Sequence, residues 1–347
     1  MRKRPGAPIR LLATTAAAVV VMAAACGGGG GGGETADETR PETTTTTKPV
    51  PAPLTGVILT DGNVAKRPAI NIKIDNGPQG RPQAGIDKAD VLIEEKVEGG
   101  ITRFVAVFHS EDADPVGPVR SVRSTDIALV TAIGGVFVFA GGIPEFERQA
   151  RALPLTVVSE SVSADGFKYP ADKRRPYKTY TDTATLRSMA KDHDEPPPAL
   201  FDFLGTGEVF NPAGVVPATS ADVPYGRTAF KVEFDVASNT WKRSTDGRPH
   251  ATAGGGQLAF ANVIIQRTSY RPTPFKDPAG SVVDEAVVVG SGDAVILSQG
   301  RQVPARWTKP SANAVTTYTD AVGNPIKLTP GRTLIALPPA DAAISVT

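Results

Sequence analysis

Two short segments combine residue types that bind anions. GPVRSVRSTD (residues 117–126) contains two arginines, two serines and an aspartate, shortly after the apolar run FVAVFH. Arginine holds carboxylate and phosphate groups through paired hydrogen bonds. If residues 103–109 form a strand and residues 124–133 form a helix, GPVRSVRS is the loop between them. AGGIP (140–144) would then be the next strand-to-helix loop.

Strand-to-helix loops of α/β sheets are common ligand sites, and the helix N-termini there present free N–H groups. We therefore expect these two loops to share one pocket for an anionic group. The expected lining residues are Arg120, Ser121, Arg123, Ser124, Gly141 and Gly142. The alternative is a helix capped by Ser124 whose arginines are occupied by ion pairs with Glu94, Glu95 or Glu98.

Other polar residues could extend this site. KIDNGPQGRPQ (73–83) places Asp75, Asn76 and Arg81 at a strand end and in the loop after it, where ligand groups often lie. An Asx-type turn at Asp75 and Asn76 is an equal alternative. The basic segment DKRRPYK (172–178) could hold an anionic polymer or be a solvated loop. The predicted ligand-binding set is completed by Glu95, Arg103 and His109.

The acidic residues permit a catalytic alternative. Glu94, Glu95 and Glu98 could supply two carboxylates for acid/base chemistry on a glycan. Side chains alternate along a strand, however, so Glu94 and Glu95 lie on opposite faces. We therefore expect these carboxylates to form ion pairs with Arg103.

Histidine offers a second catalytic alternative. His109, with Ser121 or Ser124 and Asp126, supplies a base, a nucleophile and an orienting acid, but no G-x-S-x-G motif accompanies them. The three histidines are far apart and have no metal-ligand spacing, so we predict neither zinc nor any cofactor. A calcium or magnesium site built from carboxylates stays open.

Hydrophobic periodicity predicts the elements that position these residues. PAINIKID (68–75) alternates apolar and polar residues, as a half-buried strand does. Residues 103–158 indicate the order strand, helix, strand, helix, strand, and TATLRSMAKDH adds one more helix. From residue 229 onward, short β segments are separated by Gly, Asn and Asp turns. The fold class is therefore α+β: a layered sheet/helix N-terminal domain with a mixed sheet, and a β-rich C-terminal domain.

The register of one hairpin decides which acids face the arginines. ADVLIEEKVEGGITRFVAVFHS predicts two strands with the glycines at 99 and 100 in the turn. With a two-residue turn, Glu98 pairs with Ile101. A slip of one residue would bring Glu95 to the face that carries Arg103.

The N-terminus indicates export. A basic segment, an apolar run and AAAC ending in Cys26 are typical of a secretory signal and resemble a bacterial lipobox, in which the cysteine receives lipid. We predict a signal peptide at 1–26, a disordered Gly/Thr/Pro linker at 27–53, an N-terminal domain at 54–203 and a C-terminal domain at 204–347. The alternative is an ordinary signal peptide cut nearby.

Charge argues against nucleic-acid binding. The chain has 37 basic and 36 acidic residues, and cleavage before Cys26 removes four basic ones. The mature chain then has 37 − 4 = 33 basic against 36 acidic residues. A charge near −3 gives no general attraction to nucleic acid or to an anionic membrane. Membrane contact is expected through the lipid alone.

Long sequence motifs add a family resemblance. KIDNGPQGRPQAGIDKADVLIEEKVEGGITRFVAVFHS followed by GPVRSVRSTD resembles the N-terminal signature of the YerB-like bacterial lipoproteins (domain of unknown function 3048). NVIIQ, GSGDAVILSQGR, ARWTK and GRTLIAL are similar to the C-terminal part of that family. The resemblance implies a sheet–sheet–helix N-terminal domain, a second β-rich domain and a lipid-anchored extracytoplasmic location. It brings no reaction with it.

These observations favour a lipid-anchored binding or scaffold protein of the cell envelope. Its expected partner is an anionic group on a cell-wall polymer or an envelope peptide or protein. The first alternative is a cell-wall hydrolase or transferase that uses Glu94, Glu95, Glu98 or His109. The second is a structural protein-interaction module whose charged residues form an internal ion-pair network.

Overall fold

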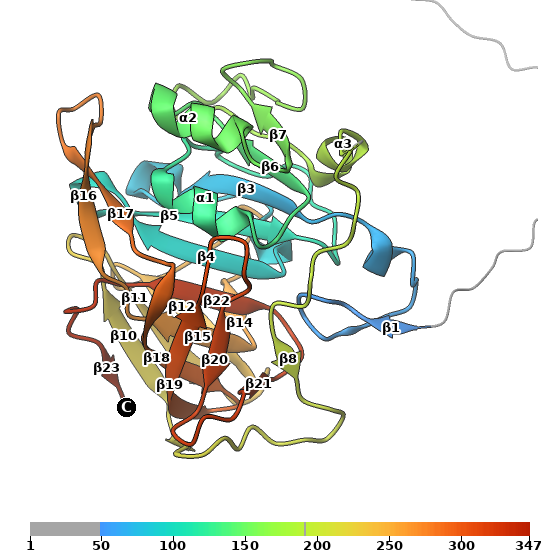
Figure 1. Ribbon diagram of the computed structural model, residues 1–347, viewed down its shortest axis with the longest axis vertical. Helices are drawn as coiled ribbons and strands as arrows, with labels where there is room; N and C mark the ends of the chain where they lie inside the picture. Colours follow the sequence, from blue (N-terminus) through green and yellow to red (C-terminus); the bar gives the residue numbers. More distant parts are fainter. Residues whose placement is uncertain (1–48, 191) are drawn as a thin grey trace, which may run out of the picture. The chain divides into compact units, whose positions relative to one another are not determined.

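The computed structural model describes residues 49–190 and 192–347 (Figure 1). The predicted signal peptide, Cys26 and most of the predicted linker lie outside these residues. Residues 49–53, the end of the predicted linker, are among the described residues. Strand β1 (Val50–Pro51) pairs with β2 (Ile58–Leu59), and Ala52 is buried.

One large mixed sheet joins both halves of the sequence. Strands of the C-terminal part form one side of it and strands of the N-terminal part form the other. The two sides meet where β22 pairs in parallel with β4. In sheet order the strands are β20 (Thr317–Thr319), β19 (Arg301–Lys309), β18 (Gly290–Ser298), β15 (Asn262–Gln266), β22 (Thr333–Leu337), β4 (Val91–Lys96), β5 (Thr102–Phe108), β3 (Ile70–Asp75), β6 (Val136–Phe139) and β7 (Thr156–Ser159), with β9 (Val216–Pro217) on β19.

Each face of the N-terminal side of this sheet is covered by a different layer (Figure 1). Helices α1 (Ser124–Val130) and α2 (Pro144–Arg151) pack on one face through an apolar cluster that includes Val105, Phe137 and Phe146. A second sheet packs on the other face through Phe230 and Trp241. Its strands are β13 (Arg248–Pro249), β12 (Thr240–Thr245), β11 (Ala229–Asp235), β10 (Ser220–Pro224) and β23 (Ser345–Val346), with β14 (Ala259–Phe260) on β12.

Smaller elements complete the described residues. The hairpin of β16 (Tyr270–Lys276) and β17 (Val282–Ala286) was not predicted, because Pro272 and Pro274 argue against a strand. Helix α3 (Thr183–Ser188) lies within the predicted segment TATLRSMAKDH. The remaining elements are β8 (Asp202–Phe203), which pairs with β21 (Lys327–Leu328), and the short 3-10 helices η1 (Val64–Lys66), η2 (Pro78–Gly80), η3 (Ile86–Lys88) and η4 (Glu98–Gly100).

The α+β class and the layered build agree with the sequence analysis, but two local expectations were wrong. Strand β3 is buried on both faces rather than one, because the second sheet covers the face opposite the helices. The hairpin loop between β4 and β5 has the slipped register. Glu95 lies opposite Arg103, and the loop includes Glu98 as well as the two glycines.

The division at residues 203 and 204 stays a prediction. Residues 49–190 and 192–347 form a single compact unit, and the large sheet runs through both predicted domains. Among residues 49–190 and 192–347, no helix is long and apolar enough to cross a bilayer.

Candidate functional site

Three arginines from two elements converge beside the end of strand β3. Arg103 lies at the start of β5, while Arg120 and Arg123 come from the loop that leads into α1. That loop runs along β3, since the Arg120 N–H donates to the carbonyl of Lys73 at 2.8 Å. Helix α1 begins at Ser124, so Arg123 occupies the N-cap position expected for Ser124. We call Arg103, Arg120 and Arg123, together with Asp75 and Glu98, the guanidinium cluster.

Two of the three arginines have carboxylate partners. Arg120 Nε lies 2.7 Å from Asp75 Oδ2. Arg123 makes a two-point contact with Glu98, with Nε to Oε1 and Nη2 to Oε2 both at 2.7 Å. Burial opposes ionisation of Glu98, but hydrogen bonds and the charge of Arg123 outweigh it and lower the pKa of this carboxyl. The expected alternative, ion pairing of the arginines with Glu98, therefore holds for Arg123.

Among residues 49–190 and 192–347, no carboxylate forms an ion pair with Arg103, although the negative charges of Asp75 and Glu98 favour its charged form. Only 6% of this residue is exposed, and its Nη1 donates to the carbonyl of Ser121 at 3.0 Å. Within the described residues, Arg103 Nε has no hydrogen-bond partner. Burial, followed by the charges of Arg123 and Arg120, lowers the pKa of Arg103 to about 9. The expected ion pairs between Arg103 and the three glutamates are thus not formed, and the cluster has three cations for two carboxylates.

The two predicted loops do lie side by side. The Val122 N–H donates to the Gly141 carbonyl at 3.0 Å, and Ser121 Oγ donates to the Ala140 carbonyl at 3.2 Å. Gly141 has φ +71° and open space where a side chain would begin. A Cβ at Gly142 would lie 2.6 Å from Val122 Cγ1, so close packing explains this second glycine. Ser124 Oγ is buried without a hydrogen-bond partner in the described residues.

The basic segment at 172–178 adjoins the cluster. Arg120 Nη1 donates to the carbonyl of Pro176 at 3.3 Å, and its guanidinium lies 5.5 Å from the centroid of the Tyr177 ring. The neighbouring Arg174 is exposed. Two motifs that are separate in the sequence are thus in contact through Arg120.

A buried triad lies behind the cluster. Lys73 Nζ contacts Glu95 Oε1 and, at 2.6 Å, Asp126 Oδ1, and none of the three side chains is more than 1% exposed. Asp126 also accepts the Arg123 N–H at 2.7 Å, which links the triad to the arginine loop. Burial raises the pKa of Glu95 to about 7. The positive charge of Lys73 opposes this shift, and the negative charge of Asp126 adds to it. Such a pKa suits acid/base chemistry, but the burial withholds Glu95 from solvent.

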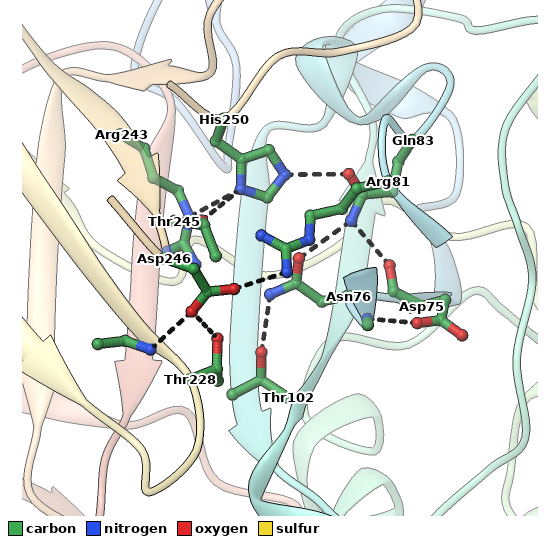
Figure 2. Close-up of polar contacts among 12 residues, drawn as sticks. Asp75, Asn76, Arg81, Gln83, Thr102, Thr228, Arg243, Thr245, Asp246 and His250 are labelled. Atoms are coloured by element: carbon green, nitrogen blue, oxygen red, sulfur yellow. Dashed lines mark hydrogen bonds and ion pairs between the residues drawn. The ribbon is translucent and has the colours of Figure 1, made fainter. Parts of the chain in front are cut away.

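On the opposite face of the sheet, a second polar network joins the two layers of sheet (Figure 2). Glu94 receives both terminal nitrogens of Arg243 from β12, each at 2.9 Å, and these side chains are 1% and 0% exposed. Asn76 Nδ2 and Thr102 Oγ1 also donate to Glu94 Oε1, at 3.0 and 2.8 Å. Glu94 thus has four donors, and Asn76 serves this network rather than the arginines.

His250 continues the same network (Figure 2). Its Nδ1 lies 3.2 Å from Arg243 Nε and 2.7 Å from Thr245 Oγ1, and its Nε2 lies 3.0 Å from Gln83 Oε1. Because Arg243 Nε is a donor, Nδ1 accepts, and the ring proton resides on Nε2. Burial, followed by the charge of Arg243, lowers the pKa of His250 to about 2. The imidazole is therefore neutral and fully bonded.

An open pocket of about 540 Å³ lies beside this histidine, between the loop after β3 and the β12–β13 hairpin. Arg81 spans it with an ion pair from Nη2 to Asp246 Oδ2 at 2.7 Å (Figure 2). Arg248 lines the same pocket. Arg81 therefore belongs to this pocket and not to the guanidinium cluster.

His109 lies away from both groups. It follows the far end of β5 from Arg103, six residues away or about 20 Å along a strand. Its ring is fully buried, and burial followed by the charges of Arg67 and Arg187 lowers its pKa to about 4. The structure thus separates His109 from Ser121, Ser124 and Asp126. Among the described residues, no three His, Cys, Asp or Glu side chains are placed to hold a metal ion.

The structure therefore divides the predicted binding set into groups. Asp75, Arg103, Arg120, Ser121, Arg123 and Gly141 lie together, with Glu95 behind them. Sequence analysis missed Arg243, His250 and Gln83. No local signal marks them: GRPHATAGGG has only turn-forming composition, and Arg243 lies 149 positions from Glu94.

Comparisons with known proteins agree with this architecture. The model "Protein of unknown function (DUF3048) N-terminal domain" matches residues 54–195, and "Protein of unknown function (DUF3048) C-terminal domain" matches residues 221–335. The chain is 27% identical over 314 residues to "Putative lipoprotein YerB" of Bacillus subtilis (strain 168), covering 86% of this chain and 89% of that protein. A crystal structure of YerB protein from Bacillus subtilis matches with a TM-score of 0.72 and 25% identity, over 85% of this chain and 99% of that one.

Proposed function

The chain belongs to the DUF3048 family, and from this premise we propose that it is a lipid-anchored binding protein of the cell envelope. Its guanidinium cluster holds an anionic group, carried by a cell-wall polymer or an envelope peptide. The anchor is a lipid on Cys26. The lipobox-like AAAC and the description of the Bacillus relative as a lipoprotein support this location.

The observation that carries the proposal is the unpaired charge of Arg103. A buried ion is costly unless a counter-ion and further hydrogen bonds compensate it. Arg120 and Arg123 have Asp75 and Glu98, whereas Arg103 has one main-chain carbonyl. A bound carboxylate or phosphate would supply the missing negative charge and accept the remaining guanidinium N–H groups.

The surroundings of the cluster favour a ligand that arrives from solvent. The Arg120 side chain is 18% exposed and stacks against Tyr177, which is also partly exposed. The exposed Arg174 nearby extends the positive field outward, and such fields raise the rate at which anions arrive.

Binding also fits the geometry better than catalysis does. Glu94, Glu95 and Glu98 each have a cationic partner, and Glu94 and Glu95 are 1% exposed. A general acid or base needs contact with the substrate, directly or through a water molecule. The hydrolase or transferase alternative therefore has no supporting contact among these carboxylates.

The test replaces Arg103 by methionine and compares it with Arg123→Met. Arg103→Met removes an unpaired buried charge, so we expect unchanged or higher stability without ligand. Arg123→Met strands Glu98, so we expect a loss of about 3 kcal/mol. Thermal unfolding would be followed with inorganic phosphate, acetate and purified wall fragments. A ligand at one hundred times its Kd stabilises wild type by about 2.7 kcal/mol.

We expect Arg103→Met to lose this ligand-induced stabilisation, while the control Arg174→Met weakens it slightly. Equal stabilisation of wild type and Arg103→Met by every probe would refute the site. A destabilisation of unliganded Arg103→Met as large as that of Arg123→Met would instead support the internal ion-pair network.

A further inference from the structure

A separate cavity lies where β22 and β4 join the two sides of the large sheet, and helix α1 and residues 200–201 contribute to its walls. Its walls are mostly apolar, and both the N-terminal and the C-terminal parts of the sequence contribute to them. The lining includes Ile93, Leu129, Ile133, Phe201, Ile335 and Leu337, and its polar side chains are those of Lys309, Gln266, Thr316 and Tyr318. The cavity has a volume of about 50 Å³.

An adjoining groove shares five of these wall residues. It has a volume of about 310 Å³ and runs between residues 199–202 and 315–319. The shared residues are Leu200, Phe201, Val315, Thr316 and Tyr318. Since about 10–15 Å³ of such volume is enough for one water molecule, the inner cavity admits only a small group. The groove can take a longer group, and its walls combine apolar side chains with those of Asp202, Thr317 and Thr319.

Lys309 gives the inner cavity its chemistry. This lysine ends strand β19 and is only 3% exposed, and its Nζ donates to the carbonyl of Ala314. Within the described residues, no carboxylate forms an ion pair with it. Burial lowers the pKa of Lys309 to about 8. At neutral pH the ammonium form predominates, so a positive charge is held in apolar walls without a counter-ion.

We propose that this cavity and groove bind a small monocarboxylic acid with an alkyl chain. The carboxylate sits on the Lys309 ammonium in the inner cavity, and the alkyl chain extends past Phe201 and Tyr318 into the groove. The unpaired cation selects a single negative charge. The apolar side chains shared by the cavity and the groove favour hydrocarbon over a sugar or a peptide backbone, whose polar groups they would leave unsatisfied.

The first experiment needs no variant. Isothermal titration of the full chain would compare octanoate with octylamine, which has the same alkyl chain and the opposite charge. We expect saturable binding of octanoate and at least about tenfold weaker binding of octylamine, because a hydrogen bond to a charged group contributes a factor of this size. Absence of saturable octanoate binding would overturn the proposal.

The second experiment assigns the charge to its residue. Lys309→Met keeps an unbranched side chain and removes a buried cation, so the protein should stay folded. We expect octanoate affinity to fall about tenfold or more while 1-octanol binds as before. Lys276→Met, at an exposed position on β16, serves as the control and should bind octanoate like wild type. Equal octanoate affinity of Lys309→Met and wild type would overturn the assignment.

Discussion

Breaking the ion pair between Glu94 and Arg243 should show how strongly the two layers of sheet depend on each other. Glu94 comes from β4 of the large sheet and Arg243 from β12 of the second sheet. Both bonds between them measure 2.9 Å, and the guanidinium also lies 4.1 Å from the centroid of Phe230. The perturbations are Arg243→Met, Glu94→Gln and the double variant.

The expected magnitudes follow from what each change leaves behind. Arg243→Met leaves a buried carboxylate with the side chains of Asn76 and Thr102 as its remaining donors. Glu94→Gln leaves a buried guanidinium facing one neutral carbonyl. Each single change should cost about 3–5 kcal/mol, because an uncompensated buried charge remains. The double variant removes both charges, so its cost should fall short of the sum by about 2–3 kcal/mol.

Urea unfolding followed by tryptophan fluorescence measures these costs, since Trp241 and Trp307 are both buried. The control is Lys231→Met, which breaks the exposed pair with Glu233 and should cost less than about 1 kcal/mol. The reasoning fails if Arg243→Met costs no more than this control. It also fails if the costs of the two single variants simply add in the double variant.

Two further predictions concern pH and a close backbone contact. The pKa values of His109 and His250 are about 4 and about 2 in the folded protein, against an ordinary 6.5. As the pH falls, the histidines of the unfolded chain are protonated before those of the folded protein. The free energy of unfolding therefore decreases by about 1.4 kcal/mol per pH unit for each histidine below pH 6.5. His109→Leu should flatten the dependence of the urea midpoint on pH between pH 7 and pH 5. Gly135→Ala should cost more than Gly134→Ala in urea unfolding, because both glycines have positive φ (+75° and +80°) but only at Gly135 would a Cβ meet a neighbour, the Ala69 carbonyl at 2.2 Å. Equal costs for the two alanine variants, or a pH profile unchanged by His109→Leu, would contradict these accounts.

Local signals located the elements and part of the site. The strands at 102–108 and 136–139 and the helix start at Pro144 lie where the sequence pattern placed them, while α1 begins at Ser124, one residue before the start that an N-cap at Ser124 predicts. Because β6 lies next to β3, the loops that follow these strands meet, as the Val122–Gly141 hydrogen bond shows. Adjacent loops of one sheet could thus be inferred from the order of elements alone.

Long-range partners could not be inferred in this way. Whether Glu98 or Glu95 faces Arg103 changes if the loop between β4 and β5 is one residue longer or shorter. The two adjacent glycines do not determine that length. Asn71, Lys73 and Asp75 alternate with isoleucines and predicted a solvated face. A sheet from the other half of the sequence covers β3, and this packing has no counterpart in the local pattern.

The position of β22 has a consequence for how the chain matures. Residues 333–337 insert beside residues 91–95, near opposite ends of the described sequence. Synthesis starts at the N-terminus, so β4 is made long before β22. One edge of β4 therefore stays unpaired until almost the whole polypeptide has been synthesised. Bare strand edges invite aggregation, and distant pairings form slowly. We therefore expect a chaperone that covers the unpaired edge of β4 to assist folding. A chain truncated shortly before residue 333 would lack β22, and this edge of β4 would stay unpaired.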